Sequence, residues 1–137
     1  MPPFSFYFLI IVMIIAIDFD GTVVTHEYPR IGMDIGAIPV LKELQDSGHK
    51  LILLTMRSGK TLGEAIDWLK EKGINLYAVN INPKQYQWTT SRKVYANYYI
   101  DDQALGCPLI YNPNISDRGF VDWVRMREIL VENGLII

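Results

Sequence analysis

The 137-residue chain contains one cysteine, Cys107, so it can form no intramolecular disulfide bond. This composition is typical of a reducing compartment, and we expect a cytoplasmic protein. No lysine or arginine precedes Arg30, although residues 4–17 are apolar apart from Ser5. A secretory signal would carry positive charge ahead of its apolar core. The apolar stretch is also shorter than the roughly 20 residues that span a bilayer, so we expect no membrane span.

The chain has little excess charge, because 13 basic residues oppose 15 acidic ones. Proteins that bind nucleic acid through their general surface are usually strongly basic, so we expect no such binding. The chain also lacks repeats, low-complexity tracts and linkers. We predict one domain over residues 13–137, after an apolar extension over 1–12. That extension either lies upstream of a natural start at Met13 or packs as an extra strand or against a neighbouring subunit.

Two carboxylates follow the first apolar run. Residues 14–17 are Ile-Ile-Ala-Ile, which indicates a buried strand over 13–18, and the chain continues as Asp18-Phe19-Asp20-Gly21-Thr22. Open α/β sheets bind ligands at the carboxyl ends of their strands. An unpaired buried carboxylate is costly, so we expect a cation beside these acids. The alternative is a structural turn, because Asp-Gly is common in turns.

A second acidic pair, Asp101-Asp102, follows the apolar residues 98–100. Adjacent acids raise each other's pKa unless a cation offsets their charge. Two such strand ends side by side would suit Mg²⁺, which takes one or two carboxylates, waters and phosphate oxygens. Here the alternative is a pair of acids that cap a short helix.

Strands and helices alternate along the chain, which predicts a three-layer α/β/α, Rossmann-like parallel sheet with helices on both faces. We expect strands over 13–18, 50–55, 77–81, 98–100 and 107–111, and helices over 37–47, 60–72, 89–96 and 120–133. The polar strand tips converge if the first strand is central. The predicted strand order is therefore 3-2-1-4-5.

The order of these motifs resembles the haloacid dehalogenase-like (HAD) phosphohydrolase superfamily over roughly residues 13–111. Asp18-Phe19-Asp20-Gly21-Thr22 is similar to its first motif, and Thr55, at the end of an apolar strand, to its second. Lys93 is similar to its third motif, and Asp101-Asp102 to the Asp-Asp form of its fourth. The resemblance implies the same sheet order and a phosphatase that acts on phosphate esters.

The resemblance also implies a role for each residue. Asp18 would be the nucleophile that forms an aspartyl-phosphate, and Asp20 the general acid and base. Mg²⁺ would be held by the carboxylates of Asp18 and Asp101 and by the backbone carbonyl of Asp20, with Asp102 helping directly or through water. Thr55 and Lys93 would bind the phosphoryl group. Each keeps a structural alternative: Thr55 as a plain strand-end hydroxyl, and Lys93 as a solvated lysine.

Other residues stay open between function and structure. Arg57 either binds substrate phosphate or lies in solvent. Tyr86 and Trp88 either stack on a ring of the substrate or pack against the protein, with packing favoured. For the histidines, His26 and His49, and for Cys107 we expect no catalytic role, and Cys107 suits a small buried position.

The spacing between motifs leaves no room for a cap domain. About fifteen residues separate Thr22 from the first expected helix, enough for a flap that includes residues 26–30. A capless site is open to a small or macromolecular phosphorylated substrate, and it is compatible with a homo-oligomer whose neighbour acts as a lid. Two alternatives are a non-catalytic phosphate- or partner-binding module and a receiver-like domain phosphorylated on an acid. Receivers, however, carry their phosphoacceptor on a later strand.

Overall fold

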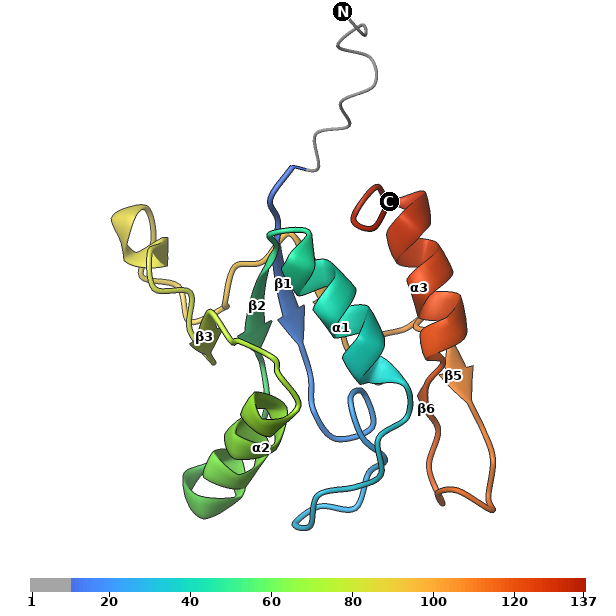
Figure 1. The fold of residues 1–137 in the computed structure, drawn as a ribbon. Helices are drawn as coiled ribbons and strands as arrows, with labels where there is room; N and C mark the ends of the chain where they lie inside the picture. Colours follow the sequence, from blue (N-terminus) through green and yellow to red (C-terminus); the bar gives the residue numbers. More distant parts are fainter. Residues whose placement is uncertain (1–10) are drawn as a thin grey trace, which may run out of the picture.

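The computed structural model describes residues 11–137 (Figure 1). The predictions for the N-terminal extension concern mainly residues 1–10, which lie outside this range. In chain order the elements are β1 (Ile14–Ile17), α1 (Ala37–Asp46), β2 (Lys50–Leu53), α2 (Gly59–Glu71), β3 (Ala78–Val79), the 3₁₀ turn η2 (Gln85–Gln87), β4 (Tyr98–Ile100), β5 (Leu109–Ile110), β6 (Phe120–Val121) and α3 (Trp123–Glu132).

A four-stranded parallel sheet has the order β3-β2-β1-β4. β1 is central, because it pairs with β2 on one side and with β4 on the other. In this register Ile17, the last residue of β1, lies opposite both Leu53 and Ile100. The prediction for these four strands is confirmed. The residues that follow β1, β2 and β4 therefore emerge at the same edge of the sheet.

The predicted fifth parallel strand is wrong. Leu109–Ile110 pairs antiparallel with Phe120–Val121 and forms a separate two-stranded sheet, β5-β6. A strand of two residues gains few hydrogen bonds from the large sheet, whereas a nearby partner closes a short hairpin. The helix expected from residue 120 consequently begins only at Trp123. Its N-cap is Asp122, whose carboxylate accepts hydrogen bonds from the N–H groups of Val124 and Arg125.

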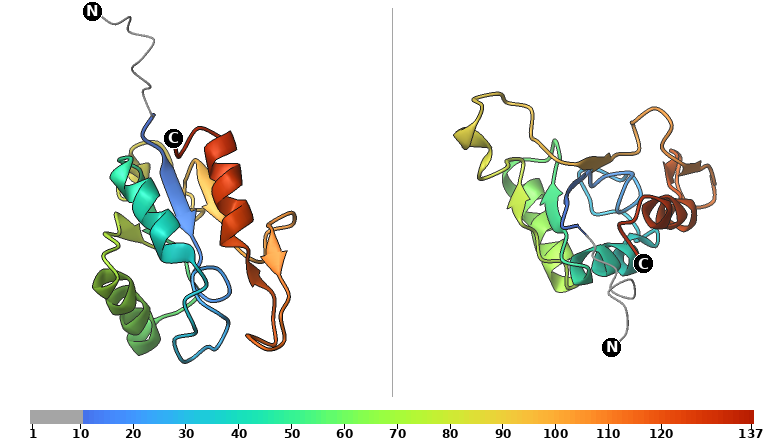
Figure 2. Two further views of the ribbon diagram at one scale, coloured as in Figure 1. Left: turned by 45° about the vertical axis from the view of Figure 1, so that its right-hand side comes forward. Right: turned by 90° about the horizontal axis from the view of Figure 1, so that it is seen from above.

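Helices cover one face of the sheet, so the predicted three-layer arrangement is wrong for the described residues. Figure 2 shows α1, α2 and α3 on one side and the connection between β3 and β4 on the other. The main core lies on the helical face: β1 contributes Ile15 and Ile17, and each helix contributes its buried apolar side chains. The opposite face holds a small cluster in which Ala16 and Ile52 are covered by Ala96 from the connection.

The helix predicted over 89–96 is also absent from the described chain, and a buried glutamine explains why. The amide of Gln85 donates to the carbonyls of Ser91 and Lys93, and its oxygen accepts the N–H of Tyr95. These side-chain bonds satisfy backbone groups that a helix would otherwise pair. The segment therefore forms a loop that is folded around Gln85.

Residues 11–137 contain no cap domain. Between β1 and α1 the chain forms a loop whose base is closed by Thr25 and Met33. The N–H of Thr25 donates to the carbonyl of Met33 at 2.9 Å, and the N–H of Met33 donates to the hydroxyl oxygen of Thr25 at 2.8 Å. In this range no helix combines the length and hydropathy that crossing a membrane requires.

Candidate functional site

Three carboxylates meet at the carboxyl edge of the sheet. Asp18 follows β1, and Asp101 and Asp102 follow β4. The Asp18 N–H donates to the carbonyl of Ile100 at 3.0 Å, which fixes one strand end against the other. Asp18, Asp101 and Asp102 each offer an oxygen, and these oxygens lie within 4.8 Å of one another. Because hard divalent cations prefer oxygen ligands at this spacing, the cluster could hold a metal ion.

The surroundings of Asp18 disfavour its ionised form. Burial raises the pKa of Asp18 to about 8, and a hydrogen bond with Asp102 and the negative charge of Asp101 add to this rise. Burial and neighbouring acids both disfavour the ionised carboxylate, and a cation among these oxygens would favour it. Such a cation would displace the proton and allow Asp18 to ionise.

Thr22 joins the acids. Its side chain is fully buried, and its hydroxyl lies 3.0 Å from Oδ2 of Asp18 and 3.1 Å from Oδ1 of Asp102. The same hydroxyl oxygen accepts the N–H of Asp102 at 3.0 Å. A hydroxyl has one proton, so it serves only one of the two carboxylates at a time. Thr22 thus sets the distance between the acids that follow β1 and β4.

Gly21 makes this approach possible. Its φ is +84°, a conformation that other residues rarely adopt, and a Cβ at this position would lie 2.5 Å from Oδ2 of Asp102. The turn is held from behind by the indole N–H of Trp123, which donates to the carbonyl of Thr22 at 2.7 Å. The Asp-x-Asp-Gly-Thr turn is therefore rigid, and it is anchored to α3.

The second acid of the motif, Asp20, has a protein cation of its own. Nε of Arg57 donates to Oδ2 of Asp20 and Nη2 donates to Oδ1, both at 2.7 Å. The side chains are 1% and 12% exposed, respectively. This bidentate, charge-assisted pair is the strong form of the Arg–carboxylate interaction, and it raises the pKa of Arg57.

Every N–H of the Arg57 guanidinium is used within the protein. Besides Asp20, it donates to the carbonyls of Pro29 and Thr61 at 3.2 Å and to that of Arg30 at 2.7 Å. A guanidinium has five donors, and these bonds account for all five. Arg57 therefore does not lie in solvent, and none of its donors is free to bind a phosphate. This arrangement favours a structural role. Sequence reasoning had no signal for the partner, because Asp20 lies 37 residues away.

Thr55 and Lys93, the residues expected to bind phosphate, are placed differently. Thr55 lines the cleft beside Asp18; its hydroxyl oxygen accepts the N–H of Arg57 at 3.1 Å, which leaves its proton to donate. Lys93 is exposed, and it is not one of the described residues that line the cleft. Its ammonium lies 5.9 Å from the centre of the Tyr99 ring. The site role of Lys93 stays a prediction that requires its side chain to move.

The acids open into a cleft of about 540 Å³. Its lining consists of the predicted residues Asp18, Asp20, Thr55, Arg57, Asp101 and Asp102, together with His26, Tyr28, Leu54, Met56 and Gln103. Tyr86 and Trp88 are not among them. The flap over 26–30 was predicted, but its ring side chains were not assigned to the cleft. The exposed Met56, next to Thr55, gave no signal in the sequence.

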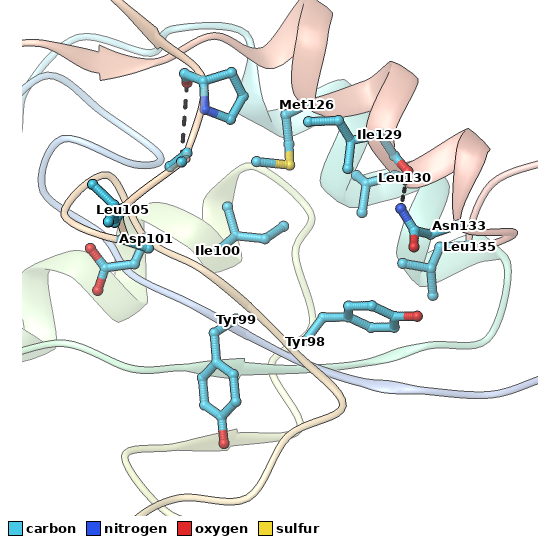
Figure 3. A pocket seen from close by; sticks show the side chains of 14 residues that line it. Tyr98, Tyr99, Ile100, Asp101, Leu105, Met126, Ile129, Leu130, Asn133 and Leu135 are labelled. Atoms are coloured by element: carbon cyan, nitrogen blue, oxygen red, sulfur yellow. Dashed lines mark hydrogen bonds between the residues drawn. The ribbon is translucent and has the colours of Figure 1, made fainter.

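A separate apolar cavity of about 240 Å³ lies between β4 and α3 (Figure 3). Ile100 lies toward Met126 and Leu130 of α3 and the Tyr98 ring extends toward Leu135, whereas Tyr99 points away. The half-buried Cys107 also lines this cavity, and burial raises the pKa of its thiol. A thiol that resists ionisation is a poor nucleophile, as expected for a structural cysteine.

His49 is structural as well. Its imidazole is buried, with Nδ1 3.0 Å from the N–H of Met13 and Nε2 2.9 Å from the carbonyl of Leu135. The ring therefore accepts one hydrogen bond and donates the other, and it ties the start of β1 to the C-terminal segment.

The fold and the acidic cluster define a Rossmann-like α/β protein with a candidate metal site at the carboxyl edge of its parallel sheet. Among solved structures, the chain is similar to a conserved protein from Bacteroides thetaiotaomicron, with 41% sequence identity and a TM-score of 0.72. The match covers 89% of this chain and 92% of that one. The chain therefore belongs to the same family as this Bacteroides protein. No family model matches the chain, and neither does any curated protein.

Proposed function

We propose that the protein is a Mg²⁺-dependent phosphomonoester hydrolase of the HAD type, with Asp18 as its nucleophile. The observation that carries this proposal is the cluster of Asp18, Asp101 and Asp102 at adjoining strand ends, with oxygens within 4.8 Å of one another. Dense negative charge beside a nucleophilic carboxylate suits a site that binds a divalent cation and a phosphate together.

Asp18, Asp101 and Asp102 would hold Mg²⁺, together with the backbone carbonyl of Asp20. When bound, Mg²⁺ supplies positive charge that offsets the repulsion between Asp18 and the phosphate. The pKa of Asp18, raised to about 8 by burial and by its acidic neighbours, fits this assignment, because a bound cation would favour the ionised carboxylate. Mg²⁺ is favoured over softer metals because the site offers only oxygen ligands.

The reaction would proceed in two displacements. An oxygen of Asp18 attacks phosphorus, the bond to the leaving oxygen breaks, and Asp20 donates a proton to that oxygen. A water molecule then attacks the aspartyl-phosphate and gives its proton to Asp20; phosphate leaves, and the Asp18 carboxylate is restored. Each Asp20 oxygen accepts one bond from Arg57 and keeps a further lone pair for this proton.

Thr55 would donate its free hydroxyl proton to a phosphate oxygen. Lys93 would neutralise phosphoryl charge after its ammonium leaves the ring of Tyr99.

The test is phosphate release from 4-nitrophenyl phosphate, with and without Mg²⁺. Asp18→Asn should lower kcat/KM at least about 10³-fold, because it removes the nucleophile. Asp117→Asn is the matched control, since Asp117 is exposed and lies outside the cleft lining. If Asp18→Asn retains full activity, the mechanism is rejected. Phosphate binding without turnover across a broad panel of esters would instead support a binding module.

A further inference from the structure

Part of the cleft wall takes no part in the proposed chemistry. Tyr28 and His26 line the cleft from the loop between β1 and α1, and Met56 lines it from the segment after β2. Tyr28 is 54% exposed and Met56 is completely exposed. Large apolar side chains at the mouth of a polar cleft favour contact with a ligand, because water solvates them poorly.

The loop that carries Tyr28 is held in place by Arg57. The guanidinium donates to the carbonyls of Pro29 and Arg30, and it lies 5.2 Å from the centre of the Tyr28 ring. Thr25 and Met33 close the base of the same loop. Tyr28 therefore sits on a fixed backbone, and its ring offers a preorganised surface for a planar group.

The charges of the cleft restrict the ligand further. Four acids line it, and its one arginine has no donor left. A bound divalent cation would offset only part of the charge of Asp18, Asp101 and Asp102. A leaving group with an anionic group of its own would therefore be repelled.

We propose that the wall formed by Tyr28, His26 and Met56 selects phosphomonoesters whose leaving group is an uncharged planar ring, with Tyr28 as the main specificity-determining residue. This inference rests on the proposed function, because it assumes that the phosphoryl group lies at Asp18. The leaving group then extends from Asp18 toward the mouth of the cleft, where the Tyr28 ring stacks against it.

The experiment compares three esters whose leaving alcohols have similar chemistry. Benzyl phosphate carries a neutral ring, cyclohexylmethyl phosphate a saturated ring of the same size, and 4-carboxybenzyl phosphate a charged ring. For the wild type we expect kcat/KM to be about three- to tenfold higher for the benzyl ester than for the cyclohexylmethyl ester. The carboxylate should lower kcat/KM about tenfold.

Three variants locate the effect. Tyr28→Ala should bring the benzyl-to-cyclohexylmethyl ratio close to one, whereas Tyr28→Phe should keep it. Tyr86→Ala should also keep the ratio, since Tyr86 is a 76%-exposed tyrosine outside the cleft lining. A wild-type ratio of one, or an unchanged ratio in Tyr28→Ala, would overturn this inference while leaving the phosphatase intact. No release of phosphate from any of the three esters would instead refute the proposed function.

Discussion

Asp18 and Asp20 stand two residues apart on the same turn, yet their surroundings are opposite. Asp20 has a buried cation that contacts both of its oxygens at 2.7 Å. Asp18 faces two further acids, and its pKa is raised to about 8. The fold therefore provides the counterion for Asp20, whereas Asp18 belongs to an acidic cluster that could hold a metal ion. Two acids of one turn thus differ in whether the protein itself supplies a positive charge beside them.

Removal of the internal cation should have the largest effect on stability. Arg57→Ala leaves the buried Asp20 carboxylate unpaired and three carbonyls without their donor, so we expect a loss of about 3–5 kcal/mol. Urea unfolding measures it. Arg57→Lys should recover only part of the loss, because an ammonium cannot span Asp20 and the loop carbonyls. Arg125→Ala, which breaks two exposed ion pairs, is the control and should cost much less. Equal losses for the two arginines would contradict the comparison.

The raised pKa of Asp18 predicts that the stability of the metal-free protein depends on pH. Folded Asp18 keeps its proton up to about pH 8, whereas in the unfolded chain it ionises near the ordinary value of 3.8. Between these limits the folded state binds more protons, so stability falls as the pH rises. In EDTA, the free energy of unfolding should fall by at most about 1.4 kcal/mol per pH unit between pH 5 and 8.

Asp18→Asn carries no titrating carboxyl at this position, so its profile over the same range should be flatter than that of the wild type. Parallel profiles for the two proteins would show that Asp18 does not hold the proton. Urea titrations at pH 5, 6, 7 and 8 distinguish the two results.

Binding of Mg²⁺ to the folded protein should depend on the Asp102 side chain but not on the Asp20 side chain. Millimolar Mg²⁺ should raise the Tm of the wild type, because it binds only the folded acids. Asp102→Asn should weaken Mg²⁺ affinity about tenfold or more, with a smaller Tm shift at equal concentration. Asp117→Asn serves as the control. An undiminished Tm shift in Asp102→Asn would remove Asp102 from the site.

The smallest effect is expected at the hydroxyl that joins the acids. Thr22→Val removes the hydrogen bonds to Asp18 and Asp102 while it keeps the volume of the side chain, so we expect a loss of about 1 kcal/mol. Thr22→Ser should retain most of the stability. Thermal unfolding of the two variants at pH 7 compares them directly. A valine variant as stable as the wild type would mean that the hydroxyl does not order the turn.

The accuracy of the sequence-based predictions followed the range of the interactions involved. The strands before Asp18 and Asp101 were predicted because short apolar runs that end in acids are local signals. The fifth strand failed because a two-residue segment takes the partner that tertiary structure brings to it. The helix over 89–96 failed because the Gln85 side chain replaces its backbone bonds, and no periodicity reports such a contact.

The sequence by itself determined the acidic turn and the apolar strands that lead into it and into Asp101, because each depends on patterns within a few residues, and the spacing of the motifs left no room for a cap domain within residues 11–137. Only the tertiary structure decided which acid receives Arg57, where Lys93 lies and which rings border the cleft. Those outcomes depend on contacts between segments tens of residues apart, and a side chain's type does not specify the partner that folding brings beside it.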